Sequence, residues 1–246
     1  MNRNILVLTR VPDQPVEQRA VAQAIESLSI GASAETSTNA SRTLLACGAV
    51  AGPLFITVAL IQAFTRSGFD PIRHPLSLLS VGDLGWIQIT NFVVAGLLFV
   101  ASAAGMRRIL HAGLGETLGP WLVGVFGVSL ILGGIFVADP ALGFPPGTPE
   151  GAPAQLSWHG TLHAVAPVVG FISLIAACFV FARRYAALKQ WVWAAYCAVT
   201  GVVVLALSVL TSTENFVPLW AAMVLGFAWP SVVAAQLIVG CVGMEQ

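Results

Sequence analysis

Six apolar segments, each about as long as a membrane-spanning helix, constrain this chain more than any other feature. We expect these segments at residues 43–64, 85–106, 119–138, 158–182, 190–211 and 217–240. A helix needs roughly 20 apolar residues to cross the hydrocarbon core of a bilayer. Because lipid offers no hydrogen-bond partners, each segment must satisfy its own backbone, and a helix does so. The sequence therefore predicts an all-α integral membrane bundle of six transmembrane helices.

The composition supports a chain that is surrounded mostly by lipid. Apolar residues make up 57% of the chain and charged residues only 9%, whereas a soluble domain is about one quarter charged. Lysine and arginine balance aspartate and glutamate at 11 each. Because a nucleic-acid-binding protein needs a basic surface, this balance argues against nucleic acid. We expect membrane lipids as partners, and the sequence identifies no protein partner.

Positively charged residues divide unequally between the two ends of the predicted bundle. Nine of them lie before the first span, after the second span, or between the fourth and fifth spans. Only Arg66 and Arg73 lie in loops at the other end. Cytoplasmic loops of membrane proteins carry the excess of lysine and arginine. The distribution predicts cytoplasmic termini in a multi-pass protein of the cell (plasma) membrane.

Residues 1–41 differ in composition from the rest of the chain. Charged side chains are scattered there among serine, threonine, alanine and glutamine. A segment with so little apolar surface does not offset the entropy of folding. We therefore predict a polar, mostly disordered cytoplasmic tail at 1–41, followed by a six-span transmembrane domain at 42–246.

Small and polar residues indicate how the spans pack together. The third span contains a row of small residues, namely Gly124, Gly127, Ser129, Gly133 and Gly134. Together with Gly96 of the second span, this row favours a close approach of two backbones. Gln88 and Asn91 lie three residues apart on one helical face, where exposure to lipid would be costly. We expect these amides to bond to a neighbouring helix.

The first predicted extracytoplasmic loop, at about 65–84, contains two local signals. Pro75 precedes an apolar run and predicts a short helix that begins there. Asp83 directly precedes the second span, and its carboxylate is predicted to be the N-cap of that helix.

Two histidines at the start of the fourth span are the strongest candidates for chemistry. Ser157 is a good N-cap, so His159 and His163 fall in the first two turns and on one face. Pro167 removes the helical partner of the carbonyl of His163. An HxxxH pair on a helix can give one metal ion two imidazole ligands. The alternative is a pair of interface histidines that bond to loop carbonyls.

Three further residues are predicted at the same membrane depth on the same side. His74 lies in the first loop with Ser77 three residues later, and Asp139 ends the third span. With the HxxxH pair, they offer three imidazoles and a carboxylate, which suits zinc with an open water position. We predict His74, His159 and His163 as metal ligands, with Asp139 and Ser77 as catalytic residues. Alternatively, Asp139 caps a turn.

Three runs resemble a bacterial membrane family that is known as domain of unknown function 998. They are HPLSLLSVG at 74–82, GIFVADP at 134–140 and HGTLH at 159–163. The resemblance covers roughly residues 43–240 and implies a six-span helical protein of a bacterial membrane. It implies no activity.

A fainter resemblance is to the hydrolase superfamily of alkaline ceramidases and adiponectin receptors. That resemblance implies a zinc ion held by three histidines, with an aspartate and a serine nearby. The chain departs from the pattern, because it has six spans instead of seven. Its HxxxH pair lies on the fourth span, and His74 precedes Ser77 in a loop.

Two classes of function follow. The first is a non-enzymatic membrane protein with a polar His/Asp cluster at its extracytoplasmic face, where the cluster braces loops or binds a lipid or a partner. The second is a metal-dependent membrane hydrolase that acts on a lipid amide or ester. A transporter is disfavoured because the spans lack central charges.

Overall fold

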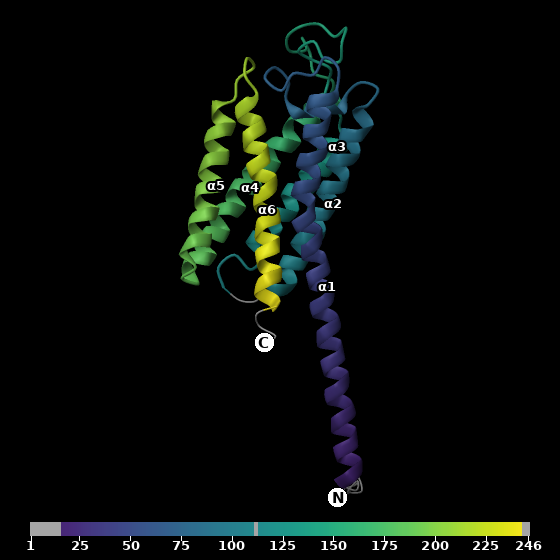
Figure 1. Ribbon diagram of the computed structural model, residues 1–246, viewed down its shortest axis with the longest axis vertical. Helices are drawn as coiled ribbons and strands as arrows, with labels where there is room; N and C mark the ends of the chain where they lie inside the picture. Colours follow the sequence, from purple (N-terminus) through teal and green to yellow (C-terminus); the bar gives the residue numbers. More distant parts are fainter. Residues whose placement is uncertain (1–15, 111–112, 243–246) are drawn as a thin grey trace, which may run out of the picture. The chain divides into compact units, whose positions relative to one another are not determined.

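The computed structural model describes residues 16–110 and 113–242, and the residues in these ranges form helices that are joined by loops. The α-helices are α1 (Val16–Thr65), α2 (Gly85–Ile109), α3 (Leu118–Ile135), α4 (Trp158–Ala187), α5 (Trp191–Leu210) and α6 (Val217–Val242) (Figure 1). Within these ranges, six helices are long and apolar enough to cross a membrane, and in α1 that segment is Thr38–Thr65. The predicted all-α architecture of six spans is confirmed.

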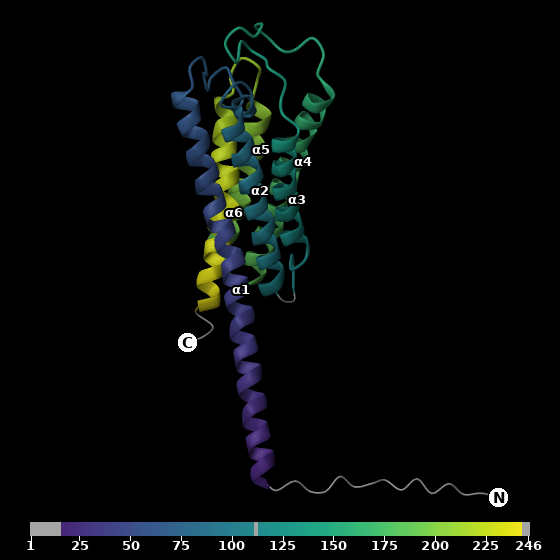
Figure 2. The same ribbon diagram turned by 90° about the vertical axis from the view of Figure 1, so that its right-hand side faces the viewer.

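The chain divides into two units, residues 1–40 and residues 41–246. Helix α1 begins at Val16 and so includes residues 16–41 of the predicted tail, whereas residues 1–15 lie outside the described residues. The disordered state of the tail stays a prediction, as does the cytoplasmic orientation of the termini. The second unit contains the bundle, in which consecutive helices from α2 to α6 pack side by side (Figure 2).

Helices α2 and α3 approach so closely that their backbones touch. A Cβ atom built on Gly96 would lie 2.6 Å from the carbonyl oxygen of Gly127. A Cβ atom on Gly127 would lie 2.8 Å from the carbonyl oxygen of Gly96. Gly133 belongs to the same row, yet a Cβ atom there would meet nothing within 4 Å. The predicted close packing is confirmed, and it depends on only part of the row.

Helices α1 and α6 are joined through the hydroxyl of Ser231. That hydroxyl donates to the carbonyl oxygen of Gly48 at 2.7 Å and accepts from the backbone N–H of Gly52 at 2.9 Å. A Cβ atom on Gly52 would lie 2.2 Å from the carbonyl oxygen of Phe227. Gly52 therefore lets α6 lie close to α1, and the hydroxyl of Ser231 joins the two helices.

Three buried amides connect α1 and α2 inside the bundle. Nε2 of Gln62 donates to Oε1 of Gln88 at 2.8 Å, and Nδ2 of Asn91 donates to the carbonyl oxygen of Phe55 at 3.0 Å. The prediction that Gln88 and Asn91 bond to a neighbouring helix is confirmed. Two atoms, Oε1 of Gln62 and Nε2 of Gln88, have no hydrogen-bond partner among the described residues.

Loops 66–84, 136–157 and 211–216 gather at one end of the bundle, and we call them the loop cap (Figures 1 and 2). A short 3-10 helix, η1 (Leu76–Ser80), follows Pro75 as predicted. The predicted role of Asp83 is wrong, because Leu84 holds the N-cap position of α2 and forms no side-chain cap hydrogen bond. Helix α2 begins at Gly85, as the apolar segment predicted, and Asp83 lies one residue before the N-cap position.

Candidate functional site

Arg66 fastens the end of α1 to the loop cap. Its guanidinium donates to the carbonyl oxygens of Leu79 and, at 2.7 Å, of Val81. It also lies 5.0 Å from the centroid of the Phe144 ring, a distance at which a cation is attracted to an aromatic face. Burial lowers the pKa of Arg66 from its ordinary value, and the carboxylate of Asp83 opposes that shift.

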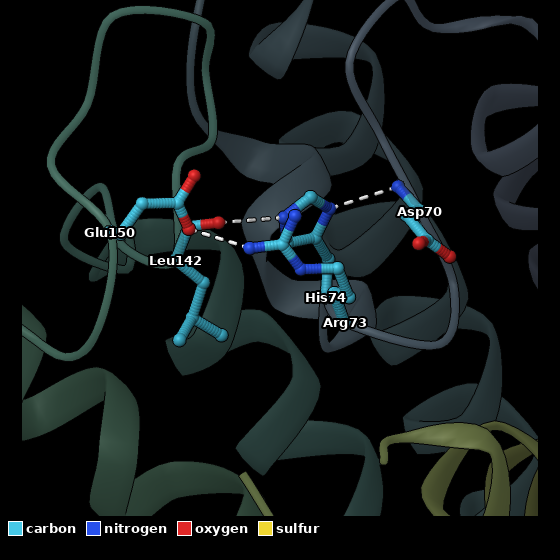
Figure 3. A network of polar contacts seen from close by, with 5 residues as sticks. All are labelled: Asp70, Arg73, His74, Leu142 and Glu150. Atoms are coloured by element: carbon cyan, nitrogen blue, oxygen red, sulfur yellow. Dashed lines mark hydrogen bonds and ion pairs between the residues drawn. The ribbon is translucent and has the colours of Figure 1, made fainter. Parts of the chain in front are cut away.

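His74 joins the first loop to the second with both of its ring nitrogens (Figure 3). Nδ1 accepts from the backbone N–H of Asp70 at 2.9 Å, and Nε2 donates to the carbonyl oxygen of Leu142 at 2.9 Å. An ion pair between Arg73 and Glu150 reinforces the same junction. The imidazole is buried, and it would have to give up one of these bonds to bind a metal ion.

Asp139 and Ser157 together cap the N-terminus of α4. The backbone N–H of Ser157 donates to Oδ2 of Asp139 at 2.7 Å, and the Ser157 hydroxyl donates to Oδ1 at 2.6 Å. The same hydroxyl accepts from the backbone N–H of Gly160 at 3.0 Å, so the predicted N-cap is confirmed. A Cβ atom on Gly160 would lie 2.2 Å from Oδ2 of Asp139. Both carboxylate oxygens are therefore engaged in capping.

His163 caps the C-terminus of α3. Its Nδ1 lies 3.0 Å from the carbonyl oxygen of Gly133 and 2.7 Å from that of Phe136. The last carbonyls of a helix lack helical partners, and a histidine can supply the missing donor. Because both oxygens only accept, Nδ1 carries the proton, and in the neutral ring Nε2 is an acceptor. No described residue bonds to Nε2, and the side chain is 6% exposed.

His159 has a different environment from His163, although the two residues share a helical face. It is exposed, and its ring centroid lies 3.5 Å from that of Trp158 and 6.1 Å from that of Phe136. In the part of the chain that the structure describes, no group of three or more His, Cys, Asp or Glu side chains could hold a metal ion. The predicted zinc site therefore stays a prediction.

A cavity of about 400 Å³ lies among α3, α4, α5 and α6 beneath η1. Ser77 and His163 both line this cavity, so the structure brings these two predicted site residues together. We call it the His163 cavity. The lining contains no lysine, arginine, aspartate or glutamate. Val168 and Ile172 of α4 form part of the wall and are exposed on the surface of the bundle, where a lipid chain would reach them.

Two serines in the wall of the His163 cavity are satisfied within their own helices. The hydroxyl of Ser129 donates to the carbonyl oxygen of Phe126 at 2.7 Å. The hydroxyl of Ser208 donates to the carbonyl oxygen of Val204 at 2.8 Å. These hydroxyl protons are therefore already engaged, whereas Nε2 of His163, a residue of the same wall, has no hydrogen-bond partner among the described residues.

The fold and the site define a class of protein, a six-span helical membrane protein with a braced loop cap above an internal apolar cavity. The chain matches the family described as "Protein of unknown function (DUF998)" over residues 49–243, and it belongs to that family. The family resemblance stated from the sequence runs is therefore confirmed. No curated protein and no solved structure gave a significant match.

Sequence reasoning missed Gln62, Arg66 and Ser208. Gln62 is the amide inside the first predicted span, and this isolated polar residue was a usable signal for a buried hydrogen bond. Arg66 directly follows the same span, and it was considered only as a positive charge in the prediction of topology. Ser208 gave no signal, because a serine in an apolar helix most often bonds to its own backbone.

Proposed function

We propose that this protein binds a membrane lipid and holds one of its apolar chains in the His163 cavity. The observation that carries this proposal is a cavity of about 400 Å³ with apolar walls and one buried imidazole. Ligand sites are typically concave and apolar, with volumes of about 300–1,000 Å³ and a few polar groups that orient the ligand.

The loop cap supports the same function. Arg66, His74 and the pair Arg73–Glu150 tie the loops to one another, so the end of the cavity beneath η1 is held by a fixed structure. With the orientation predicted from the positive charges, the loop cap faces the extracytoplasmic side. The polar cluster then braces the loops, as in the non-enzymatic class of the sequence analysis.

Filling the cavity from α5 tests the proposal. Ser208 lines the cavity, whereas the neighbouring Val209 does not and is 76% exposed. We expect Ser208→Phe to lower the amount of co-purified lipid at least about tenfold, which corresponds to ~1.4 kcal/mol. Val209→Phe should retain the lipid of the parent protein. Native mass spectrometry of detergent-purified protein measures both, and equal lipid retention by the two variants would contradict the proposal.

A metal-dependent hydrolase is the second candidate, and one observation favours it. Ser77 and His163 line the same cavity, where the carbonyl of a lipid ester or amide would lie. A metal ion bound by His74, His159 and His163 would polarise that carbonyl, with Asp139 as the base. The geometry disfavours this set, because His74 already uses both ring nitrogens.

Metal analysis distinguishes the two candidates. The measurement is zinc content by mass spectrometry, for the parent and for the double variant His159→Ala/His163→Ala. Because both ring nitrogens of His74 are already hydrogen-bonded, we expect no stoichiometric zinc in either protein. About one zinc per chain in the parent, absent from a folded variant, would make the hydrolase the better proposal.

A further inference from the structure

We propose that the lipid in the His163 cavity is uncharged and carries a hydroxyl or amide N–H that donates a hydrogen bond to Nε2 of His163. This inference rests on the proposed lipid-binding function and adds the chemical class of the ligand. Three observations support the inference. They are the position of the proton on the ring of His163, the hydrogen bonds of the other polar groups in the cavity wall, and the absence of charged side chains from the lining.

The carbonyls at the end of α3 fix the proton of His163 on Nδ1. The carbonyl oxygens of Gly133 and Phe136 lie 3.0 and 2.7 Å from Nδ1, and a carbonyl oxygen cannot donate. No acidic side chain lines the cavity to pair with an imidazolium. Nε2 of the neutral ring is therefore a hydrogen-bond acceptor that lacks a donor among the described residues.

His74, the other buried histidine, does not have an unpaired ring nitrogen as His163 does. The protons of His74 are arranged in the opposite way, since Nδ1 accepts and Nε2 donates, and both nitrogens have partners. Both imidazoles are buried, yet only His163 lines the cavity. Nε2 of His163 gains a hydrogen bond only from a guest that supplies a donor, so such a guest is favoured over one that does not.

The other side chains that line the cavity further restrict which lipids can bind there. Of the three serines in the wall, Ser129 and Ser208 already donate to carbonyls of their own helices, whereas the hydroxyl of Ser77 has no such partner among the described residues. A phosphate or carboxylate headgroup would find no basic side chain in the lining and would present only acceptors to Nε2. An ether or ester oxygen could accept from the hydroxyl of Ser77, but it would also leave Nε2 without a donor. A hydroxyl or a primary amide on a single apolar chain meets the requirement.

Asparagine at position 163 separates the binding role from the capping role. The amide Nδ2 of asparagine occupies nearly the same place as Nδ1 of histidine, so it can still donate to the carbonyl of Gly133 or Phe136. Asparagine has no atom at the position of Nε2. The acceptor of asparagine, Oδ1, lies near the position of Cδ2 of histidine. His163→Asn should therefore keep the α3 cap and the fold while displacing the acceptor from the position of Nε2.

The experiment measures binding of four probes to the full chain in detergent by native mass spectrometry. The probes form two matched pairs, oleyl alcohol with oleyl methyl ether, and oleamide with N,N-dimethyloleamide. Within each pair, methylation removes the donor and leaves the chain and the oxygen in place. We expect the parent to bind each donor at least about tenfold tighter than its methylated partner, a difference typical of one buried hydrogen bond.

The variant and the probes together make each outcome decisive. We expect His163→Asn to lose most of the preference for donors, since its acceptor Oδ1 does not reach the position of Nε2. Equal binding of donor and methylated partner by the parent in both pairs would overturn the inference, while the proposed lipid binding would stand. A preference for donors that is undiminished in His163→Asn would also overturn the inference. Failure of the parent to bind any probe would overturn the proposed function as well.

A preference within one pair only would identify the donor as a hydroxyl or as an amide. The comparison within the parent does not depend on the variant, so it decides the inference even if His163→Asn fails to fold.

Discussion

Leucine in place of Gly96 is expected to prevent assembly of the bundle, and alanine is expected to lower the free energy of unfolding by about 1–3 kcal/mol. A Cβ atom at Gly96 would lie 2.6 Å from the carbonyl oxygen of Gly127 and 2.7 Å from Cγ1 of Ile131. The first contact is with backbone, which cannot rotate away as a side chain can. Helices α2 and α3 would have to separate, and the packing on both sides of the contact would be lost.

Gly133→Ala is the matched control, because it makes the same chemical change in α3 at a site with nothing within 4 Å of the new atom. Since alanine favours helix by up to about 1 kcal/mol relative to glycine, the control should be neutral or stabilising. Unfolding in detergent with a chemical denaturant measures the difference between the two variants. If Gly96→Ala were as stable as Gly133→Ala, the close approach of α2 and α3 would be refuted.

The two glycines also show how far the sequence could predict the fold. Helix number, helix type and the short helix after Pro75 depend on apolar runs and on proline, which are local properties, and these predictions were confirmed. The row of small residues indicated close packing but could not separate Gly127, which touches α2, from Gly133, which does not. That difference depends on the rotation of α3 about its axis, which its neighbours fix.

The candidate site was less predictable, because its residues have strong local partners that spacing does not reveal. His159 and His163 share a helical face, yet one lies against Trp158 and the other caps α3. Asp139 was predicted to act as a base, with capping as the alternative, and its carboxylate bonds to Ser157. Asp139 lies at the N-terminus of α4, and His163 lies at the C-terminus of α3. Backbone groups at helix ends lack partners within the helix, so these side chains hydrogen-bond to them.

The buried amides provide a second large effect, in which a single substitution is expected to be worse than a double one. Gln88→Leu would remove the oxygen that accepts from Nε2 of Gln62 at 2.8 Å and from Nδ2 of Asn91 at 3.3 Å. Nε2 of Gln62 would keep only a 3.3 Å contact with the carbonyl oxygen of Val58. A buried donor without an adequate acceptor costs about 1–3 kcal/mol, so we expect Gln88→Leu to be destabilising by that amount.

Gln62→Leu/Gln88→Leu should recover part of that loss. The double variant removes both members of the hydrogen bond, and with them the two atoms that have no partner in the described residues, Oε1 of Gln62 and Nε2 of Gln88. Leucine has a volume close to that of glutamine and is apolar, so it can fill the same space inside the bundle. Replacing both amides can therefore be nearly neutral, whereas replacing one is costly. Equilibrium unfolding of the parent, both single variants and the double variant gives the coupling free energy. Additive losses would show that each amide acts independently, whereas a double variant more stable than Gln88→Leu would show that the amides specify the pairing of α1 with α2 and contribute little net stability.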